Sequence, residues 1–229
     1  MEGVLKDLKD LFPDEFVHLG GDEVDHECWE SKAWIQEFMQ KNELKTALEL
    51  QNFYKLKQKK LLDHKKRAVY WVFNENFKFL EEEIIQYWGP DSGYSAIQNL
   101  SNLVILSPFN KLYLDVGVGN SFGNRSWSHY NTWKDIYNFN PYPPEIKEER
   151  IIGCEVCLWS EANSDQTTEN KLWARSCAFA ERMWNVRINE QEKDILKRLH
   201  EQEKRMIKNG FMVSPSSSEF CTRNLDVCF

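Results

Sequence analysis

Five short apolar runs, separated by segments of helical periodicity, most constrain the fold of this chain. The runs are rich in β-branched and aromatic residues and cover residues 16–20, 68–73, 84–88, 103–107 and 151–159. They lack the apolar–polar alternation of strands with one solvent face, which is typical of parallel strands covered on both faces. Strands that alternate with helices form a parallel sheet with right-handed crossovers. The sequence therefore predicts an α/β fold.

Helical spacing of apolar residues predicts the segments between these strands. Four of the predicted helices cover residues 2–12, 29–41, 168–184 and 189–209. Another, the third in chain order, ends at about residue 64. In the third helix, Ala47, Leu50, Tyr54 and Leu61 fall on one face. The last helix is expected to begin at an Asn189 cap and to end at Asn209-Gly210. Residues 108–150 form a long connection, and loops of that length are uncommon unless they are functional.

One segment combines a bend with two acids at the end of the first predicted strand. It reads His18-Leu19-Gly20-Gly21-Asp22-Glu23-Val24. Glycine accepts backbone angles that other residues refuse, so the glycine pair permits a bulge or twist there. Neighbouring side chains of a regular strand point to opposite faces, so only such a bend lets both acids serve one ligand. Two adjacent carboxylates in a dry site cannot both ionise easily, which predicts that one of them acts as an acid.

Other chemistry-bearing residues also lie at, or just past, the carboxyl ends of predicted strands. They are Trp71, Trp88, Tyr113, Asp115, Trp159 and Glu161. A (β/α)8 barrel keeps its active site at this edge of the sheet. A doubly wound parallel sheet fits the same alternation, so the pattern alone leaves both architectures open.

The charge balance argues against a nucleic-acid partner. The formal net charge is -7 and the sequence pI is near 5.4, whereas phosphate-backbone binders carry clustered positive charge. The basic stretch at 55–67 is interpreted as a solvated helix face. No run approaches the ~18 apolar residues of a membrane span. Residues 1–7 hold acids and a lysine where a signal peptide would be apolar, so this chain shows no signal peptide.

The six cysteines leave the redox compartment open. Cys154 and Cys157 have metal or redox spacing, but the apolar run around them is expected to bury both thiols instead. Cys221 and Cys228 lie in a terminal tail that a disulfide could hold. Asn99 and Asn124 begin glycosylation sequons, which are compatible with a secretory route.

The acidic segment has two other interpretations. A turn with solvated acids explains any random Asp-Glu pair, but it leaves the glycines and the downstream residues unexplained. A metal site could use His18, Asp22, Asp25 and His26, but these residues lack the helical spacing between histidines that such sites show. Neither a metal nor a cofactor is expected.

The motifs resemble one known family. His18 to Val24, followed by Cys28-Trp29, is similar to the catalytic signature of the family 20 glycoside hydrolases, the β-N-acetylhexosaminidases. Further similarities follow in family order at Trp71, at Trp88, at residues 112–115 and at residues 157–161. The resemblance implies an incomplete (β/α)8 TIM barrel, about strands 4 to 8, over residues 1–229.

The resemblance also implies the chemistry. Hydrolysis of terminal N-acetylglucosamine or N-acetylgalactosamine from glycans would be substrate-assisted, with retention of configuration. Glu23 would be the general acid, Asp22 would orient the acetamide group, and Tyr113 would hydrogen-bond the acetamide oxygen.

Binding roles follow from the same resemblance. The walls of the sugar pocket would be Trp71, Trp88 and Trp159. The acceptors of hydrogen bonds from sugar hydroxyls would be Asp115 and Glu161. His18 would support a neighbouring carboxylate.

The resemblance places the family's N-terminal domain and first barrel strands outside this chain. An open half barrel exposes strand edges and apolar surface, so the polypeptide alone is expected to fold poorly or to form a homodimer, with little activity. The partner of Cys28 would lie upstream of Met1. Lysosomal or secreted localisation is expected from the family. The alternative function is an inactive relic or a sugar-binding module that kept the aromatic pocket.

Overall fold

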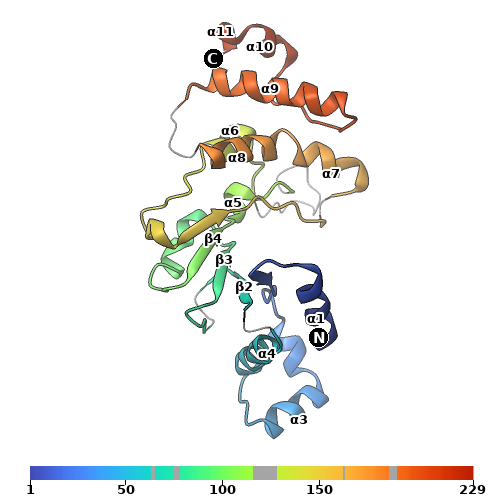
Figure 1. Ribbon diagram of the computed structural model, residues 1–229, viewed down its shortest axis with the longest axis vertical. Coiled ribbons are helices and arrows are strands. Elements are labelled where there is room, and N and C mark those ends of the chain that lie inside the picture. Colours follow the sequence, from blue (N-terminus) through green and yellow to red (C-terminus); the bar gives the residue numbers. More distant parts are fainter. Residues whose placement is uncertain (63–64, 75–77, 116–127, 162, 186–189, 229) are drawn as a thin grey trace. The chain divides into compact units, whose positions relative to one another are not determined.

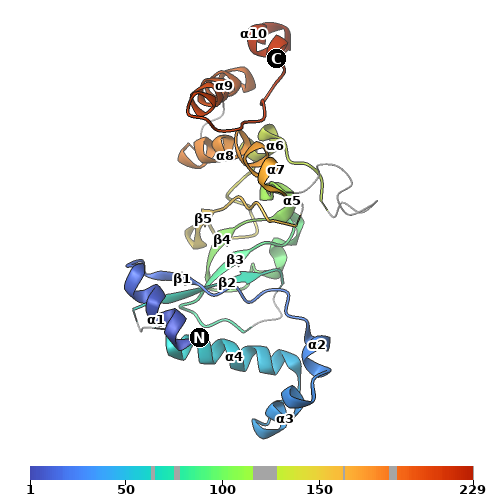
Figure 2. The same ribbon diagram turned by 90° about the vertical axis from the view of Figure 1, so that its right-hand side faces the viewer.

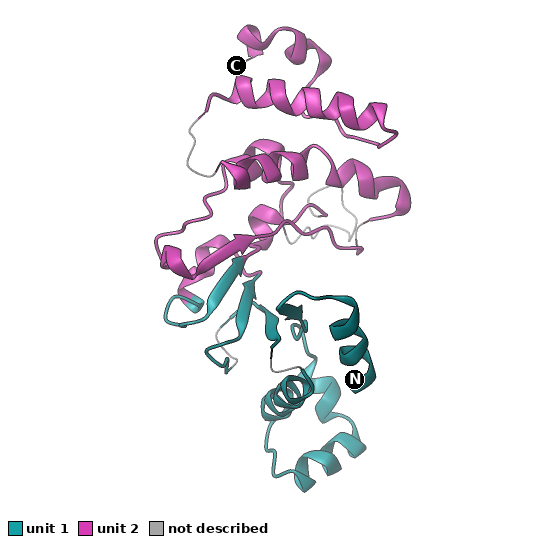
Figure 3. Cartoon of the chain, in the orientation of Figure 1, with its two compact units in different colours: residues 1–87, 96–105 teal, residues 88–95, 106–229 magenta. Residues whose placement is uncertain are grey.

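The computed structural model describes residues 1–62, 65–74, 78–115, 128–161, 163–185 and 190–228 (Figure 1). The chain divides into two compact units (Figure 3). Unit 1 comprises residues 1–87 and 96–105, and unit 2 comprises residues 88–95 and 106–229.

The described residues form one five-stranded sheet in the order β1-β2-β3-β4-β5. The strands are β1 (Phe16–His18), β2 (Arg67–Val72), β3 (Ile84–Tyr87), β4 (Leu103–Leu106) and β5 (Ile151–Cys154). Strand β2 pairs in parallel with both β1 and β3, with Val17 opposite Ala68 and Val69 opposite Ile84. All five predicted strands are present, although β5 ends at Cys154 and not at residue 159, and the parallel α/β class is confirmed with them.

Unit 1 contains the helices α1 (Glu2–Leu11), α2 (His26–Glu30), α3 (Ala33–Lys41) and α4 (Ala47–Leu61). The helix predicted over 29–41 is instead two helices. Asp25 caps α2 by accepting a hydrogen bond from the Cys28 amide, and the extended backbone of Lys32 separates α2 from α3. A small core of Ile35, Met39 and Leu50 packs α3 against α4.

Helix α4 runs beside the strands of unit 1 (Figure 2) and buries a largely polar face. The buried residues are Ala47, Leu50, Gln51, Lys55 and Gln58. Tyr54 and Leu61, expected on the apolar face, are 46% and 40% exposed. Apolar periodicity located the helix correctly. It did not identify the buried face, because Gln51 and Lys55 of α4 find hydrogen-bond partners inside unit 1.

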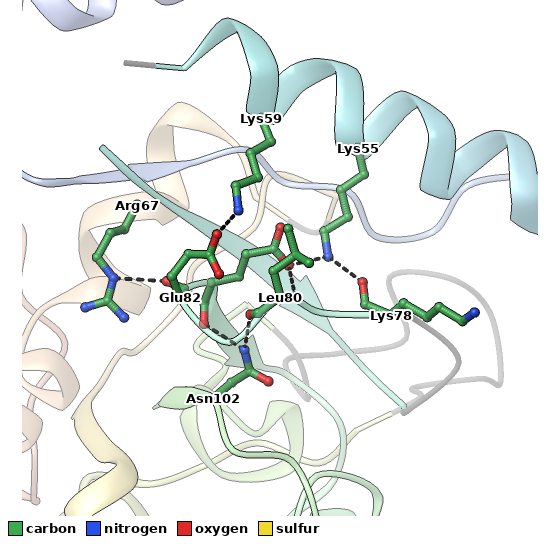
Figure 4. A network of polar contacts seen from close by, with 8 residues as sticks. Lys55, Lys59, Arg67, Lys78, Leu80, Glu82 and Asn102 are labelled. Atoms are coloured by element: carbon green, nitrogen blue, oxygen red, sulfur yellow. Dashed lines mark hydrogen bonds and ion pairs between the residues drawn. The ribbon is translucent and has the colours of Figure 1, made fainter. Parts of the chain in front are cut away.

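Lys55 is the centre of a buried polar network (Figure 4). Its Nζ atom donates to Glu83 Oε2 at 2.7 Å and to the Lys78 carbonyl oxygen at 3.0 Å. The ammonium also lies 4.0 Å from the centre of the Phe79 ring. The reading of residues 55–67 as a solvated helix face is therefore wrong at Lys55, whose charge is neutralised inside unit 1.

Unit 2 is mostly helical. Its helices are α5 (Phe109–Leu112), α6 (Trp133–Tyr137), α7 (Asp165–Leu172), α8 (Arg175–Trp184), α9 (Glu192–Lys208), α10 (Glu219–Arg223) and α11 (Leu225–Cys228). Short 3-10 turns occur at Asp91–Ala96 and Glu148–Arg150. The helix predicted over 168–184 is broken at Ala174, whose φ of 67° is left-handed. Trp184, at the end of the predicted helix, is 89% exposed.

The core of unit 2 joins α6, α8 and α9. It contains Trp133, Tyr137, Ala174, Ala178, Ile195, Leu196 and Leu199. Helix α9 follows Gln191 rather than an Asn189 cap, and residue 189 lies outside the described residues. Its end is as predicted, because Gly210 adopts a φ of 91° and the Phe211 amide donates to the Met206 carbonyl.

The cysteines behave as the sequence suggested in two respects. Cys221 and Cys228 form a disulfide that joins α10 to α11, the bond that the sequence had left as an option for the tail. Burial raises the pKa of both Cys154 and Cys157 to about 12, so neither thiol is a ready thiolate at neutral pH. The side chain of Cys28 is exposed and unpaired among the described cysteines.

Within the described ranges, none of the helices has the length and apolar character needed to cross a bilayer. The long connection at 108–150 is partly helical, through α5 and α6. Its residues 116–127, including the sequon at Asn124, lie outside the described residues.

Candidate active site

The two acids lie on a turn at the carboxyl end of β1, which we call the acid-bearing turn (residues 19–26). Pairing with β2 continues past His18, since the Leu19 amide donates to the Val69 carbonyl at 2.9 Å and the Trp71 amide donates to the Gly20 carbonyl at 3.1 Å. The backbone then turns sharply, with φ of 67° at Gly20 and 95° at Gly21. The bend predicted from the glycine pair is confirmed.

Glu23 itself has a left-handed backbone, with a φ of 50°. Such a conformation in a residue with a side chain costs about 1–3 kcal/mol and persists only where the surroundings impose it. Strained residues of this kind cluster at functional sites. The outlier falls on Glu23, the residue that the family resemblance implies as the general acid.

Gly21 meets a second constraint. A Cβ atom at Gly21 would lie 3.3 Å from Cδ1 of the buried Tyr70 ring. Both the positive φ and the close approach of the ring therefore favour glycine at this position, one residue before Asp22.

His18 shapes the start of the turn. Its Nδ1 atom accepts a hydrogen bond from the Gly20 amide at 3.0 Å, so the proton of the neutral ring is on Nε2. The imidazole centre is 5.0 Å from that of the Trp71 ring. Unit 1 thus brings His18 and Trp71 together beside the turn.

The other end of the turn is held by helix α4. Gln51 Nε2 donates to the Gly21 carbonyl at 3.0 Å, and Gln51 Oε1 lies 2.7 Å from His26 Nε2. Sequence analysis missed Gln51, because a buried glutamine on a helix leaves no signal in apolar periodicity. The described residues contain no cluster of three or more His, Cys, Asp or Glu side chains placed to hold a metal ion.

The remaining predicted residues are in unit 2, where Tyr113 and Trp159 come together. Residues on either side of Tyr113 pair with Cys157: the Leu114 amide donates to the Cys157 carbonyl at 2.7 Å, and the Cys157 amide donates to the Leu112 carbonyl at 3.0 Å. This short parallel bridge sets the centres of the Tyr113 and Trp159 rings 5.9 Å apart, with the planes tilted by 53°.

Asp115 is a buried acid beside these rings. It is 3% exposed, and its Oδ1 atom has no hydrogen-bond partner among the described residues. Burial raises the pKa of the Asp115 carboxyl, and the negative charge of Glu161 adds to the rise, while the Trp159 backbone amide opposes it by donating to the carboxylate. Asp115 can therefore accept a hydrogen bond from a ligand hydroxyl.

Two basic side chains that sequence analysis missed bind main-chain carbonyls at and next to Asp115. Lys171 donates to the Asp115 carbonyl at 3.2 Å. Arg175, which is 3% exposed, donates to the carbonyls of Leu114 and Asn131. Charged side chains on amphipathic helices usually face solvent, so only the tertiary structure identifies this pair.

Trp88 follows β3 and is half-buried. Its carbonyl accepts from the Phe109 amide at 3.3 Å, while Asp91 and Asn110 exchange two hydrogen bonds nearby. The predicted site residues are thus divided between the units. Unit 1 carries His18, Asp22, Glu23 and Trp71, and unit 2 carries Trp88, Tyr113, Asp115, Trp159 and Glu161.

A parallel sheet with acids and aromatic residues past the carboxyl ends of its strands is typical of α/β enzymes, which keep their active sites there. Comparisons with known proteins name the family. The profile "Glycosyl hydrolase family 20, catalytic domain" matches residues 1–187. The chain belongs to glycosyl hydrolase family 20. The resemblance noted in the sequence is therefore confirmed.

Similar proteins and structures agree. The chain is 31% identical to the β-hexosaminidase subunit beta of Sus scrofa over 227 residues, which is 94% of this chain and 40% of that protein. It is 28% identical to the chitooligosaccharidolytic β-N-acetylglucosaminidase of Ostrinia furnacalis, over 100% of this chain and 42% of that protein. An exo β-N-acetylglucosaminidase from Vibrio harveyi superposes with a TM-score of 0.78 at 23% identity, covering 95% of this chain and 35% of that one. The chain spans less than half the length of these relatives.

Proposed function

We propose that this chain is the C-terminal portion of a family 20 catalytic barrel, containing about strands 4 to 8, and that it hydrolyses terminal N-acetylhexosamine residues of glycans. The observation that carries the proposal is the left-handed Glu23, presented by the Gly20-Gly21 turn at the end of β1. The names of the relatives from Sus scrofa and Ostrinia furnacalis support the same substrate class.

Glu23 is proposed as the general acid. It gives its proton to the glycosidic oxygen while the 2-acetamido oxygen of the sugar attacks the anomeric carbon. The bond to the leaving group breaks, and a cyclic oxazolinium ion forms. Asp22 orients the acetamide and stabilises the positive charge that grows on its nitrogen, and the Tyr113 hydroxyl donates to the attacking oxygen.

In the second step, the Glu23 carboxylate takes a proton from water. The oxygen of that water attacks the anomeric carbon, the bond to the acetamide oxygen breaks, and the product keeps its configuration. Glu23 is then protonated again. No metal or cofactor is needed, because the substrate supplies the nucleophile.

Binding is assigned to the aromatic and acidic residues. Trp71, Trp88 and Trp159 stack on the apolar faces of the sugar. Asp115 and Glu161 accept hydrogen bonds from its outer hydroxyls. This role is supported by the Oδ1 atom of the buried Asp115, which has no hydrogen-bond partner among the described residues. His18 supports the acids through its bond to the Gly20 amide.

A lysosomal or secreted location is part of the proposal. The Cys221–Cys228 disulfide favours an oxidising compartment, and Asn99 of the first sequon is exposed. Glycans are the proposed partners, and a homodimer is the proposed assembly if this chain occurs alone. Size-exclusion chromatography with light scattering tests the assembly, and a purely monomeric, fully active chain would contradict it.

Turnover of an aryl N-acetylglucosaminide tests the function. We expect measurable release from the wild type, and its loss in Glu23→Gln. Glu27→Gln is the matched control, since it makes the same change at an exposed residue of α2. Binding of N-acetylglucosamine without any turnover would favour the sugar-binding relic instead.

A further inference from the structure

We infer that Gln51 is a positioning residue, whose single amide group ties together both ends of the segment that carries Asp22 and Glu23. The inference deepens the proposed function and rests on it. Gln51 reaches the Gly21 carbonyl, directly before the two acids, and the His26 ring, three residues after Glu23.

The two contacts use the two halves of the amide. The NH2 group donates to Gly21, so the oxygen is the acceptor, and His26 Nε2 must be the donor. The distances are 3.0 and 2.7 Å, and Gln51 is only 6% exposed. Water therefore competes poorly for either contact.

Helix α4 is anchored close to Gln51. Lys55 lies four residues further along α4, on the same helix face, and is fixed by its ion pair with Glu83 and its bond to the Lys78 carbonyl. Groups carried on an anchored helix are placed more accurately than groups on loops. Helix α4 thus places Gln51 where its amide can restrain the acid-bearing turn.

The turn needs such a restraint, because it combines positive φ angles at Gly20, Gly21 and Glu23. A left-handed glutamate relaxes when its neighbours release it. The Gln51 amide restrains residues 21 and 26, so the four residues between them have little freedom to relax. We call this arrangement the Gln51 clamp.

Three variants of the full chain test the clamp. Gln51→Met removes both contacts at similar side-chain length. Gln51→Glu keeps an acceptor for His26 and loses the donor to Gly21. Gln58→Met is the matched control, because Gln58 is also buried on α4 and no hydrogen bond of its side chain is found among the described residues.

Amide hydrogen exchange is the first readout, since it needs no activity. We expect faster exchange over residues 21–26 in Gln51→Met, faster exchange confined to the Gly21 end in Gln51→Glu, and exchange like the wild type in Gln58→Met. Equal exchange in Gln51→Met and the wild type overturns the inference, whether or not the chain is an enzyme.

Kinetics with an aryl N-acetylglucosaminide are the second readout. A misplacement of about 1 Å can cost about 100-fold, so we expect kcat of Gln51→Met to fall by about 100-fold with KM unchanged. In an active chain, faster exchange with unchanged kcat also overturns the positioning role. If the wild type has no turnover at all, the proposed function fails, and hydrogen exchange alone decides the clamp.

Discussion

The Nζ atom of Lys55 lies 2.7 Å from Oε2 of Glu83, and both side chains are nearly closed to solvent. Burial lowers the pKa of Lys55, and the hydrogen bond to Glu83 opposes that shift. Glu83 also accepts from the Leu80 amide, and Asn102 donates to the carbonyls of Leu80 and Glu83. This network attaches α4 to the segment that enters β3.

Breaking the Lys55–Glu83 pair should therefore destabilise unit 1. Glu83→Gln leaves a buried ammonium without its anion, which typically costs about 3–5 kcal/mol of unfolding free energy. The double variant Lys55→Met/Glu83→Gln should lose less than the sum of the single changes. Urea unfolding of the full chain measures both. The exposed pair of Lys59 and Glu82 is the control, and Glu82→Gln should cost about 1 kcal/mol or less. Additive losses at Lys55 and Glu83 would contradict the expected coupling.

Alanine at Gly21 should be more harmful than alanine at Gly20. Both positions have a positive φ, which alanine tolerates poorly. Only at Gly21 would the new Cβ also meet the Tyr70 ring, at 3.3 Å, whereas at Gly20 nothing lies within 4 Å. We expect a loss of about 1–2 kcal/mol at Gly20 and a larger loss at Gly21, measured by urea unfolding. Equal losses would show that the ring moves aside freely.

Asp115 should make stability depend on pH. Burial raises its folded-state pKa above 3.8, so the folded chain holds this proton more tightly than the unfolded chain. The resulting stabilisation is complete below pH 3.8 and is lost as pH rises through the folded-state pKa. Asp115→Asn lacks this loss. The unfolding free energy of Asp115→Asn minus that of the wild type should therefore increase from pH 4 to pH 7. If this difference stays constant over that range, the Asp115 carboxyl does not have a raised pKa in the folded chain.

Removing the hydroxyl of Tyr113 should reduce turnover. If that hydroxyl holds the acetamide oxygen for attack, Tyr113→Phe should lower kcat by about 100-fold or more, as loss of one preorganised donor does elsewhere. Tyr137→Phe is the matched control in the same unit, because the Tyr137 hydroxyl bonds to Glu181 rather than to a ligand. Initial rates with an aryl N-acetylglucosaminide compare the two, and equal rates would remove Tyr113 from the mechanism.

Much of the fold was readable from neighbouring residues. The five strands, the bend at Gly20-Gly21 and the end of α9 at Gly210 all follow from local preference and short-range spacing. The disulfide of Cys221 with Cys228 closes a loop of only a few residues, so it too could be expected. The errors at Ala174 and at Lys32 were breaks inside periodic segments, where tertiary packing overrides helix propensity.

The candidate site could be predicted only as a set of residues. Chain order and motif gave Asp22 and Glu23, which come shortly after β1, and also Tyr113 and Asp115, which the sequence placed just past a strand but which follow helix α5 instead. Their supports were hidden, since Gln51 acts on a turn 30 residues away and Arg175 on a carbonyl 61 residues away. Polar side chains carry no periodic signal that distinguishes a buried partner from a solvated surface.

The sequence by itself determined the α/β class, the family and the acids at the end of β1, because strand preference, glycine conformation and motif order are properties of short segments. Only the tertiary structure decided that α4 turns Gln51 and Lys55 inward, and that Arg175 lies buried beneath Leu114. Burying a polar group is tolerated only when it gains a hydrogen-bond or ion-pair partner. The partners of these side chains come from distant parts of the chain.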